Sequence, residues 1–338
     1  MELREHEAIA DLTTMRLGGK ARHVAELRTP DDVVEAYRFA REHSLPTSVL
    51  GGGSNVVGRN EGFDGMILLN RTGGLRIVEE GDNTVVIEAA SGVPLDDLAG
   101  FSAQRGYTGL EATSAIPGTV GGAVMQNAGA YGQELADVLV TVKAYDTQHD
   151  EFVVFERDEL ELSYRHSIFN SSEKGCYFIT AATVSLRRGV IESELYGSLQ
   201  AYLDEHGITD RDPMTIRAAV SAIRAEKLPD PAEFASSGSF FKNITVREDE
   251  IVDLRERFPG IPIYLIGACW EIASGWLVEQ AGLKGKLLHG MRVSDKAALI
   301  LINESARSYA DLAAARAEIT QAVQEKFGFT LCQEPEEL

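Results

Sequence analysis

Cysteine is scarce in this chain of 338 residues, and long apolar runs are absent from it. The three cysteines, Cys176, Cys269 and Cys332, are odd in number and widely spaced, which argues against a disulfide framework and a zinc site of paired ligands. No run of eighteen apolar residues occurs, and the first residues are charged with no apolar stretch behind them. We therefore expect neither a membrane span nor a secretory signal, and we expect a protein of the reducing cytoplasm.

Positive charge is also in short supply, because 32 Lys and Arg residues stand against 52 Asp and Glu residues, for a net charge of −20. Nucleic acid and anionic membrane surfaces both need a basic partner, so neither is expected as a ligand. One basic cluster is predicted on a helix that opens at Asp212-Pro213, where Arg217, Arg224 and Lys227 lie on one stripe. These cations either form the solvent-exposed face of an amphipathic helix or bind a diphosphate. Because the chain is acidic overall, cations gathered on one stripe favour the diphosphate.

The pattern of helix and strand signals predicts an alternating α/β chain of more than one domain. It predicts helices over 30–44, 94–104, 213–227 and 308–326. It predicts strands over 47–50, 66–69, 85–90, 138–145, 152–155 and 177–184. The length exceeds what a single core usually supports, which indicates two or three domains.

Two glycine-rich stretches follow predicted strands. The first, Gly51-Gly52-Gly53-Ser54-Asn55, lets backbone N–H groups approach a pyrophosphate, although a tight structural turn explains it about equally well. It matches neither a Rossmann fingerprint nor a P-loop. The second stretch runs from Ile116 to Gly132, and its small residues leave room for a planar ring system. A purely structural loop is the alternative, but loops of this length are seldom ordered without a ligand or a function.

Three distant segments supply groups suited to reducing an unsaturated carboxylate. They are Tyr164-Arg165-His166-Ser167-Ile168-Phe169, Gly238-Ser239-Phe240-Phe241-Lys242-Asn243 and Leu331-x-x-Glu334. An arginine can hold a carboxylate bidentately while a positioned acid protonates the neighbouring carbon. Taken singly, the arginine is more often part of a surface ion pair, the serine a turn hydroxyl and the glutamate a solvated side chain of an acidic tail.

These motifs, with Thr13-Thr14-Met15-Arg16-Leu17-Gly18-Gly19 before them, resemble the UDP-N-acetylenolpyruvoylglucosamine reductases of the subtype carrying a Tyr-Arg-x-Ser-Ile-Phe motif. The resemblance runs from about residue 13 to 335. It implies an α/β (α+β) fold with vanillyl-alcohol-oxidase-like (PCMH-type) FAD-binding domains and a C-terminal α/β substrate-binding domain. The implied boundaries are 1–70 for FAD-binding subdomain 1, joined by 328–338, then 71–215 for subdomain 2 and 216–327 for the substrate-binding domain.

The resemblance also implies roles for individual residues. It implies Arg165, Ser239 and Glu334 as catalytic residues. For non-covalent FAD it implies Gly51, Gly52, Gly53, Ser54, Asn55, Pro117, Gly118, Thr119, Gly121, Gly122 and Arg224. For the substrate it implies Tyr131, Tyr164, Tyr196, Lys227 and Asn243, with Tyr196 as a mobile tyrosine and the last two at the diphosphate. Two places depart from similar enzymes, because Glu271 stands where a lysine is usual and Asp295-Lys296-Ala297 replaces a stretch that often contains histidine.

The implied reaction is reduction of UDP-N-acetylglucosamine enolpyruvate to UDP-N-acetylmuramate, a peptidoglycan precursor, with NADPH as hydride donor. We expect a cytoplasmic monomer that requires no metal. Two alternatives stay open. One is another flavin oxidoreductase of the same fold, such as a sugar or alcohol oxidase, but these often attach flavin through His or Cys, and neither occurs between Gly51 and Gly132. The other is a UDP-sugar-binding flavoprotein without turnover.

Overall fold

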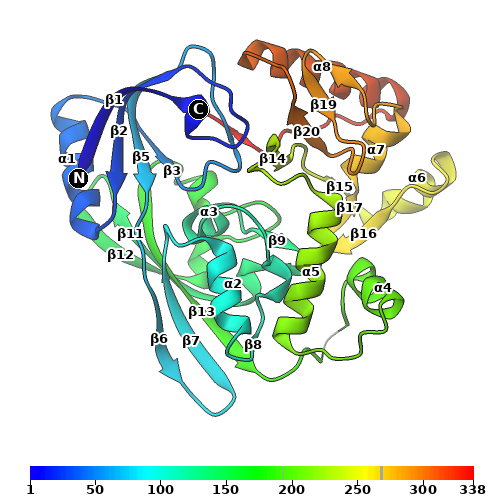
Figure 1. Ribbon diagram of the computed structural model, residues 1–338, viewed down its shortest axis with the longest axis horizontal. Helices are drawn as coiled ribbons and strands as arrows, with labels where there is room; N and C mark the ends of the chain where they lie inside the picture. The colour runs from blue at the N-terminus through cyan, green and yellow to red at the C-terminus, as the bar shows by residue number, and fades with distance from the viewer. Residues whose placement is uncertain (193, 267–268) are drawn as a thin grey trace. The chain divides into compact units, whose positions relative to one another are not determined.

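The computed structural model describes residues 1–192, 194–266 and 269–338, which divide into two compact units (Figure 1). Unit 1 comprises Met1–Glu7, Ala21–Gly52 and Asp64–Glu226. Unit 2 comprises Ala8–Lys20, Gly53–Phe63 and Lys227–Leu338. Each unit therefore gathers segments that are far apart in the sequence, and the first glycine-rich stretch contributes residues to both.

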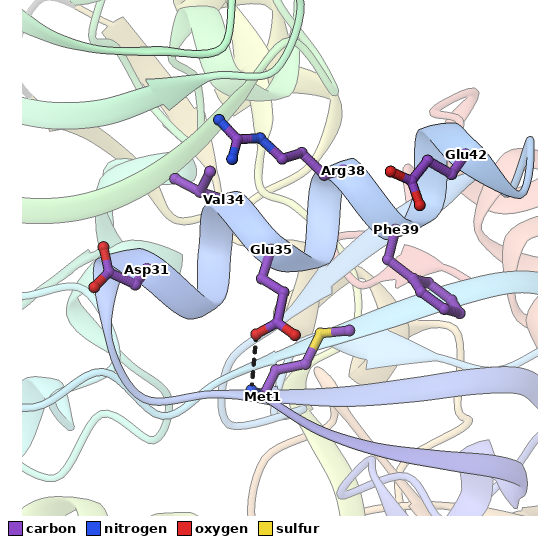
Figure 2. A pocket seen from close by; sticks show the side chains of 7 residues that line it. All are labelled: Met1, Asp31, Val34, Glu35, Arg38, Phe39 and Glu42. Carbon is purple, nitrogen blue, oxygen red and sulfur yellow. Dashed lines mark hydrogen bonds and ion pairs between the residues drawn. The ribbon is translucent and has the colours of Figure 1, made fainter.

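Unit 1 begins with a four-stranded sheet covered by helix α1 (Pro30–Glu42). The strand order is β1 (Glu2–Ala8), β2 (Lys20–Leu27), β5 (Phe63–Asn70), β3 (Thr47–Leu50). Helix α1 starts where the sequence predicts, because the Thr29 hydroxyl accepts the Asp32 N–H and the Asp32 carboxylate accepts the Thr29 N–H. Figure 2 shows the Met1 ammonium beside this helix, where it pairs with Glu35 at 3.1 Å. The same ammonium pairs with Asp32 at 3.0 Å. These contacts fix the first strand against α1.

The second sheet of unit 1 is antiparallel and carries most of the predicted strands. Its order is β12 (Glu151–Glu156), β11 (Leu139–Asp146), β13 (Tyr177–Arg188), β7 (Thr84–Ala90), β6 (Leu75–Glu80), with β8 (Tyr107–Thr108) beside β13. Helices α2 (Leu95–Ala103) and α3 (Val120–Met125) pack on one face, where Leu98 and Val124 share a core with Ile87 and Val184. Helix α3 lies inside the stretch that the sequence analysis treats as a loop, and it begins where Thr119 accepts the Gly122 N–H.

Two further helices complete unit 1. Helix α4 (Gly197–Glu205) and helix α5 (Pro213–Lys227) share an apolar cluster that includes Leu199, Leu203 and Ile216. Asp212 accepts backbone N–H groups of Met214 and Thr215, which explains the predicted start of α5. Short pieces elsewhere are β9 (Gly129–Ala130), β10 (Gln133–Glu134), η2 (Glu111–Thr113), η3 (Leu135–Asp137), η4 (Arg157–Leu160) and η5 (Ile168–Asn170).

Unit 2 has its own core between small sheets and three helices. The first sheet has the order β14 (Ala235–Ser239), β20 (Ile300–Asn303), β19 (Met291–Val293), β18 (Leu287–Leu288). The second has the order β15 (Ile244–Val246), β17 (Cys269–Ile272), β16 (Ile263–Ile266), and β4 (Val56–Val57) pairs with β21 (Glu336–Glu337). The helices are α6 (Ile251–Arg257), α7 (Ser274–Gln280) and α8 (Tyr309–Phe327), with η1 (Ile9–Asp11) and η6 (Glu248–Glu250) as single turns.

The predicted terminal helix is confirmed as α8. Ser308 and Asp311 form a capping box at its start, and Gly328 ends it with a φ of 79°. Ala315, Ile319 and Val323 lie along its buried side in the core of unit 2. Among the helices of the described ranges, none is both long and apolar enough to cross a membrane.

Candidate functional site

The two glycine-rich stretches contribute a joint surface within unit 1. A Cβ atom added to Gly51 would lie 2.5 Å from Thr119 Oγ1, and one added to Gly52 would lie 3.1 Å from Gly118 Cα. A contact of 2.5 Å is shorter than real Cβ atoms make, so the close approach of Gly51 to Thr119 requires glycine. Gly118 itself has a φ of 112°, which disfavours any other residue. The sequence could not show this contact, because several strands, among them β5, β6 and β7, and helix α2 lie between the two stretches.

Backbone pairing holds the second stretch in place. The carbonyl of Gly118 accepts from Leu95 N at 3.1 Å, and Gly121 N donates to Ser91 O at 2.8 Å. Ser91 is fully buried, and its hydroxyl accepts from Asn70 Nδ2 at 2.7 Å. Loops that carry functional backbone groups are effective when a rigid scaffold supports them. The buried polar network behind Gly121 supplies such a scaffold.

The surface formed by these glycines fits a flavin cofactor. A Cβ added to Gly122, on the exposed side of α3, would have only ordinary contacts, the nearest being Thr119 Oγ1 at 3.8 Å. Packing inside the protein therefore does not explain why position 122 lacks a side chain, whereas the approach of a planar ligand does. Pro117 is exposed beside it, and Gly52 is exposed on the other stretch.

Arg224 of α5 contributes a cation to unit 1. Its Nε donates to the carbonyl oxygen of Ala115 at 3.3 Å, and Ala115 lies two residues before Pro117. Burial lowers the pKa of Arg224, and within the described residues it forms no ion pair with a carboxylate. A partly desolvated guanidinium of this kind favours an anionic partner, as in a nucleotide cofactor.

Arg217 lies in an ion pair within unit 1. Its two terminal nitrogens donate to the two oxygens of Asp96 at 2.6 and 2.8 Å. Asp96 also accepts the Ala115 N–H at 2.6 Å, and the hydrogen bond from Arg217 lowers the pKa of this carboxyl group. Arg217 is therefore engaged in an ion pair that links α5 to α2 and the loop before Pro117. The sequence did not reveal the facing aspartate, and a role of Arg217 at a diphosphate stays a prediction.

Arg165 occupies the tip of a two-residue turn in unit 1. Ser163 and His166 exchange both backbone hydrogen bonds, at 3.0 and 3.2 Å, so Tyr164 and Arg165 form the turn between them. Arg165 has a φ of 52°, in the left-handed region that favours glycine. Its Nη2 donates to Gly129 O at 3.4 Å, and its guanidinium lies 5.0 Å from the centre of the Tyr164 ring. A strained non-glycine residue of this kind is often found at functional sites.

Two residues that the sequence analysis missed join this turn to the second glycine-rich stretch. Asn127, which is buried with a φ of 43°, donates from Nδ2 to Ser163 O at 3.1 Å and to Glu134 Oε2 at 2.8 Å. Burial raises the pKa of Glu134, while Asn127 and then the charge of Arg165 act against this shift. Asparagine next to Ala128-Gly129 is a turn signal that could have drawn attention to position 127. Arg165 is thus carried by the same framework as the glycines.

Tyr131 and Tyr196 lie together in unit 1. Their ring centres are 6.1 Å apart in an edge-to-face arrangement, and Tyr196 is 36% exposed. A Cβ added to Gly132 would lie 3.7 Å from the Tyr196 ring, an ordinary contact, so it is the φ of 81° that favours glycine at position 132. Burial raises the pKa of Tyr131, which keeps its phenol protonated at neutral pH. The pairing brings two predicted substrate residues together.

Ser239 and Glu334 are brought together in unit 2. Ser239 ends β14, directly after Gly238 with its φ of 71°, and Phe240 and Phe241 behind it are fully buried. The C-terminal segment lies beside them, because Glu334 N donates to Phe240 O at 2.9 Å and Lys242 N donates to Cys332 O at 2.8 Å. Two of the three predicted catalytic residues therefore lie on adjoining backbone segments.

The remaining predicted residues have varied surroundings. Lys227 is exposed at the end of α5. Asn243 donates to Glu271 Oε2 at 3.1 Å and accepts the Ser274 N–H at 3.2 Å, so its amide joins β17 to the start of α7. Glu271, the residue that departs from similar enzymes, is fully buried there, and its Oε2 accepts the hydrogen bond from Asn243. Within unit 2, the Gly53 carbonyl accepts the Thr14 N–H at 3.0 Å, and the Asn55 carbonyl accepts the Glu336 N–H at 2.9 Å.

A hollow of about 800 Å³ in unit 2 contains the other departure, Asp295-Lys296. Arg16 also lines it but donates to the carbonyls of Pro231 and Ala232, at 3.1 and 2.8 Å. Acidic and basic side chains are mixed around this hollow, so it has no clear charge preference for a ligand. The pocket of Figure 2 lies on α1, and none of the predicted site residues lines it.

Comparison with known proteins shows which families the two parts of the chain resemble. Residues 21–151 match the family model of an FAD binding domain, and residues 230–338 match that of the UDP-N-acetylenolpyruvoylglucosamine reductase C-terminal domain. A solved UDP-N-acetylenolpyruvylglucosamine reductase from Thermus caldophilus has the same fold, with a TM-score of 0.69, 23% identity and 99% of each chain covered. The class is thus a flavin-dependent oxidoreductase with an FAD-binding domain and a reductase C-terminal domain.

Curated relatives identify the family within this class. UDP-N-acetylenolpyruvoylglucosamine reductase of Pseudomonas aeruginosa is 35% identical over 99% of this chain and 98% of its own length. The reductase of Shewanella baltica is 39% identical, over 87% of this chain and 85% of its own. This chain belongs to the UDP-N-acetylenolpyruvoylglucosamine reductase family. The resemblance and the fold class inferred from the motifs are confirmed.

Proposed function

We propose that this chain reduces UDP-N-acetylglucosamine enolpyruvate to UDP-N-acetylmuramate, using bound FAD and NADPH, in peptidoglycan precursor synthesis. Full-length similarity to reductases of this name is the observation that carries the proposal. The glycine surface of unit 1 supports non-covalent FAD, because Gly51, Gly52 and Gly118 approach closely and Gly122 presents bare backbone. FAD, when bound, supplies the transfer of hydride from NADPH to the enolpyruvyl group.

Arg165 binds the carboxylate of the substrate in this proposal. A guanidinium can donate two parallel hydrogen bonds to a carboxylate, and those bonds strengthen as negative charge develops during reduction. The fixed turn and the contact with Gly129 O restrict where the guanidinium can lie. Such restriction lowers the reorganisation required when the charge develops.

Ser239 delivers the proton to the carbon next to the carboxylate, and Glu334 stabilises the enediolate with Arg165. A serine hydroxyl is a weak acid, so this role needs a site that excludes water and polarises the O–H bond. The buried rings of Phe240 and Phe241 and the neighbouring Lys242 support such surroundings. Glu334 contributes most if it is protonated or donates through water.

The other proposed contacts concern the nucleotide part of the substrate. Lys227 and Asn243 bind the diphosphate, and Tyr131, Tyr164 and Tyr196 line the substrate site, with Tyr196 closing over it. We also propose a cytoplasmic location, which the free thiols of all three cysteines support, and a monomeric state. The division at residues 70 and 215 into two FAD-binding subdomains and a substrate-binding domain stays a prediction, to be checked by limited proteolysis.

The test is an anaerobic experiment on the visible absorption of the flavin. Adding NADPH should bleach the absorption, and adding UDP-N-acetylglucosamine enolpyruvate should restore it. Recovery only on admitting oxygen would point to an oxidase instead, and a purified protein without flavin would remove the enzyme assignment.

Variants separate the two half-reactions. Ser239→Ala should be bleached by NADPH at the normal rate but recover at least about a hundredfold more slowly with substrate. Ser237→Ala is the matched control on the same strand, because its buried hydroxyl has no hydrogen-bond partner among the described residues. Normal recovery in Ser239→Ala would eliminate its role as proton donor. Lys227→Ala should raise the substrate KM without changing flavin content, and an unchanged KM would remove the diphosphate assignment.

A further inference from the structure

The segment that carries Glu334 is held by a cluster of side chains in unit 2, here named the tail clasp: Arg59, Tyr309, Arg316, Gln333 and Glu337. Arg316 of α8 is its centre. Its Nη1 donates to Gln333 Oε1 at 2.6 Å and to Glu337 Oε1 at 2.7 Å. One guanidinium therefore binds the tail on both sides of Glu334 in the sequence.

Two more side chains, Arg59 and Tyr309, hold Glu337. Arg59 Nε donates to Glu337 Oε2 at 2.9 Å, and the Tyr309 hydroxyl donates to Glu337 Oε1. Arg316 Nη2 donates in turn to the Tyr309 oxygen at 3.3 Å. Burial raises the pKa of Glu337, but hydrogen bonds from Tyr309, Arg316 and Arg59 outweigh it and bring the pKa to about 2. The carboxylate is thus ionised at neutral pH, and the tail clasp keeps its charges paired.

Backbone hydrogen bonds extend this attachment toward the reaction residues. Glu336 N donates to Asn55 O and Leu338 N donates to Val57 O, both at 2.9 Å, so the tail forms a parallel pair with β4. On the other side of Pro335, Glu334 N donates to Phe240 O at 2.9 Å, next to Ser239. The position of Glu334 is therefore fixed by its own backbone bond and by the tail clasp on either side of it.

We propose that Arg316, acting with Glu337, is a positioning residue that holds Glu334 in place for reduction of the enolpyruvyl substrate. The inference rests on the proposed function and on the role of Glu334 in it. Misplacing a catalytic group by about 1 Å can lower a rate about a hundredfold, so a support of this kind has a measurable effect. Gln333 and Glu337 are the groups through which Arg316 acts, and neither is required to contact the substrate.

The test compares the two half-reactions of purified, flavin-loaded variants. Arg316→Met keeps an unbranched side chain, shorter than that of arginine, and removes every hydrogen-bond donor. Its flavin should be reduced by NADPH within about twofold of the wild-type rate, whereas reoxidation by UDP-N-acetylglucosamine enolpyruvate should slow at least about tenfold. The substrate concentration at half-maximal reoxidation should change less than about threefold. Gln321→Ala is the matched control on α8, where it loses only a hydrogen bond to the exposed Glu325.

A double-mutant cycle separates positioning from general stability. If Arg316 acts through Glu334, adding Arg316→Met to Glu334→Ala should cause no further slowing beyond about twofold. An independent tenfold loss in that background would overturn the inference, as would normal reoxidation in Arg316→Met. If Arg316→Met fails to fold, Glu337→Gln carries the same test, because it keeps the shape of the side chain and removes its charge.

Failure of the proposed function and failure of the inference about Arg316 give different results in these experiments. A wild-type protein that NADPH bleaches but the enolpyruvyl sugar does not restore would refute the proposed function, and this inference with it. A normal wild-type reaction together with an unaffected Glu334→Ala variant would leave the function standing and overturn the inference. Slow reoxidation of both Arg316→Met and Glu337→Gln, without additivity in Glu334→Ala, is the result that supports it.

Discussion

Replacing Gly122 by alanine should affect the apoprotein and the flavin complex in opposite directions. Gly122 lies in helix α3 without a positive φ, and an added Cβ has its nearest neighbour at 3.8 Å, in ordinary contact. A methyl group there meets no obstacle in the protein and reduces the freedom of the unfolded chain. The apoprotein should therefore gain about 0.5–1 kcal/mol of unfolding free energy. If the flavin lies against this backbone, the same methyl group should weaken FAD binding by at least about 1.4 kcal/mol, or tenfold in Kd.

Gly51→Ala is the matched comparison, because its effect on the stability of the apoprotein arises from a contact inside the protein. The added Cβ would lie 2.5 Å from Thr119 Oγ1, the hydroxyl that caps α3. Relieving this overlap should cost the apoprotein about 1–3 kcal/mol of unfolding free energy, in addition to any loss of flavin affinity.

Urea unfolding of the apoproteins and fluorescence titration with FAD measure the two quantities separately. Apo stability should rise in Gly122→Ala and fall in Gly51→Ala, while FAD affinity falls in both. A Gly122→Ala protein that binds FAD with wild-type affinity would refute the placement of flavin against α3, whatever its stability.

Three other predictions follow from the contacts. Asp96→Asn should lower the unfolding free energy by about 1–2 kcal/mol in urea, because Arg217 loses its charged partner in a partly buried place; unchanged stability would show that the pair contributes nothing. The folded pKa of Glu337, about 2, is below its ordinary value of 4.5, so its stabilising effect is present above pH 5 and is lost as the pH falls toward 2. Between pH 6 and 3 the wild type should therefore lose about 1–2 kcal/mol more than Glu337→Gln in urea unfolding, and parallel curves would contradict this. Arg165→Lys should leave flavin reduction by NADPH unchanged and slow reoxidation by substrate at least about tenfold, since lysine cannot bind a carboxylate bidentately; normal reoxidation would remove the carboxylate role.

Local signals predicted the helix starts well, and the reason is physical. Thr29 with Pro30 and Ser308 with Asp311 satisfy the first N–H groups of their helices from within a few residues, so the sequence alone contains the interaction. The six predicted strands, which fall in β3, β5, β7, β11, β12 and β13, were found for a similar reason, since their apolar residues occur in contiguous or alternating runs. Strands β1, β2 and β6 were missed.

Interactions between distant segments could not be predicted in this way. Nothing near Gly51 in the sequence indicates that Thr119 will pack against it. Nothing near Arg217 indicates that Asp96 will accept hydrogen bonds from both of its terminal nitrogens. Arg316, which lies among other charged residues of α8, was not singled out from the sequence. In the folded chain it donates hydrogen bonds to Gln333 and Glu337, on both sides of Glu334. Such roles depend on tertiary pairing, which a single sequence does not display.

The turn at Arg165 has a consequence for engineering this protein. By local conformational preference the second turn residue, with its φ of 52°, is a place for glycine or asparagine. A procedure that optimised thermal stability from backbone preference alone would replace the arginine and discard the guanidinium that Gly129 O orients. The turn therefore marks a position where sequence optimisation for folding and optimisation for catalysis select different amino acids.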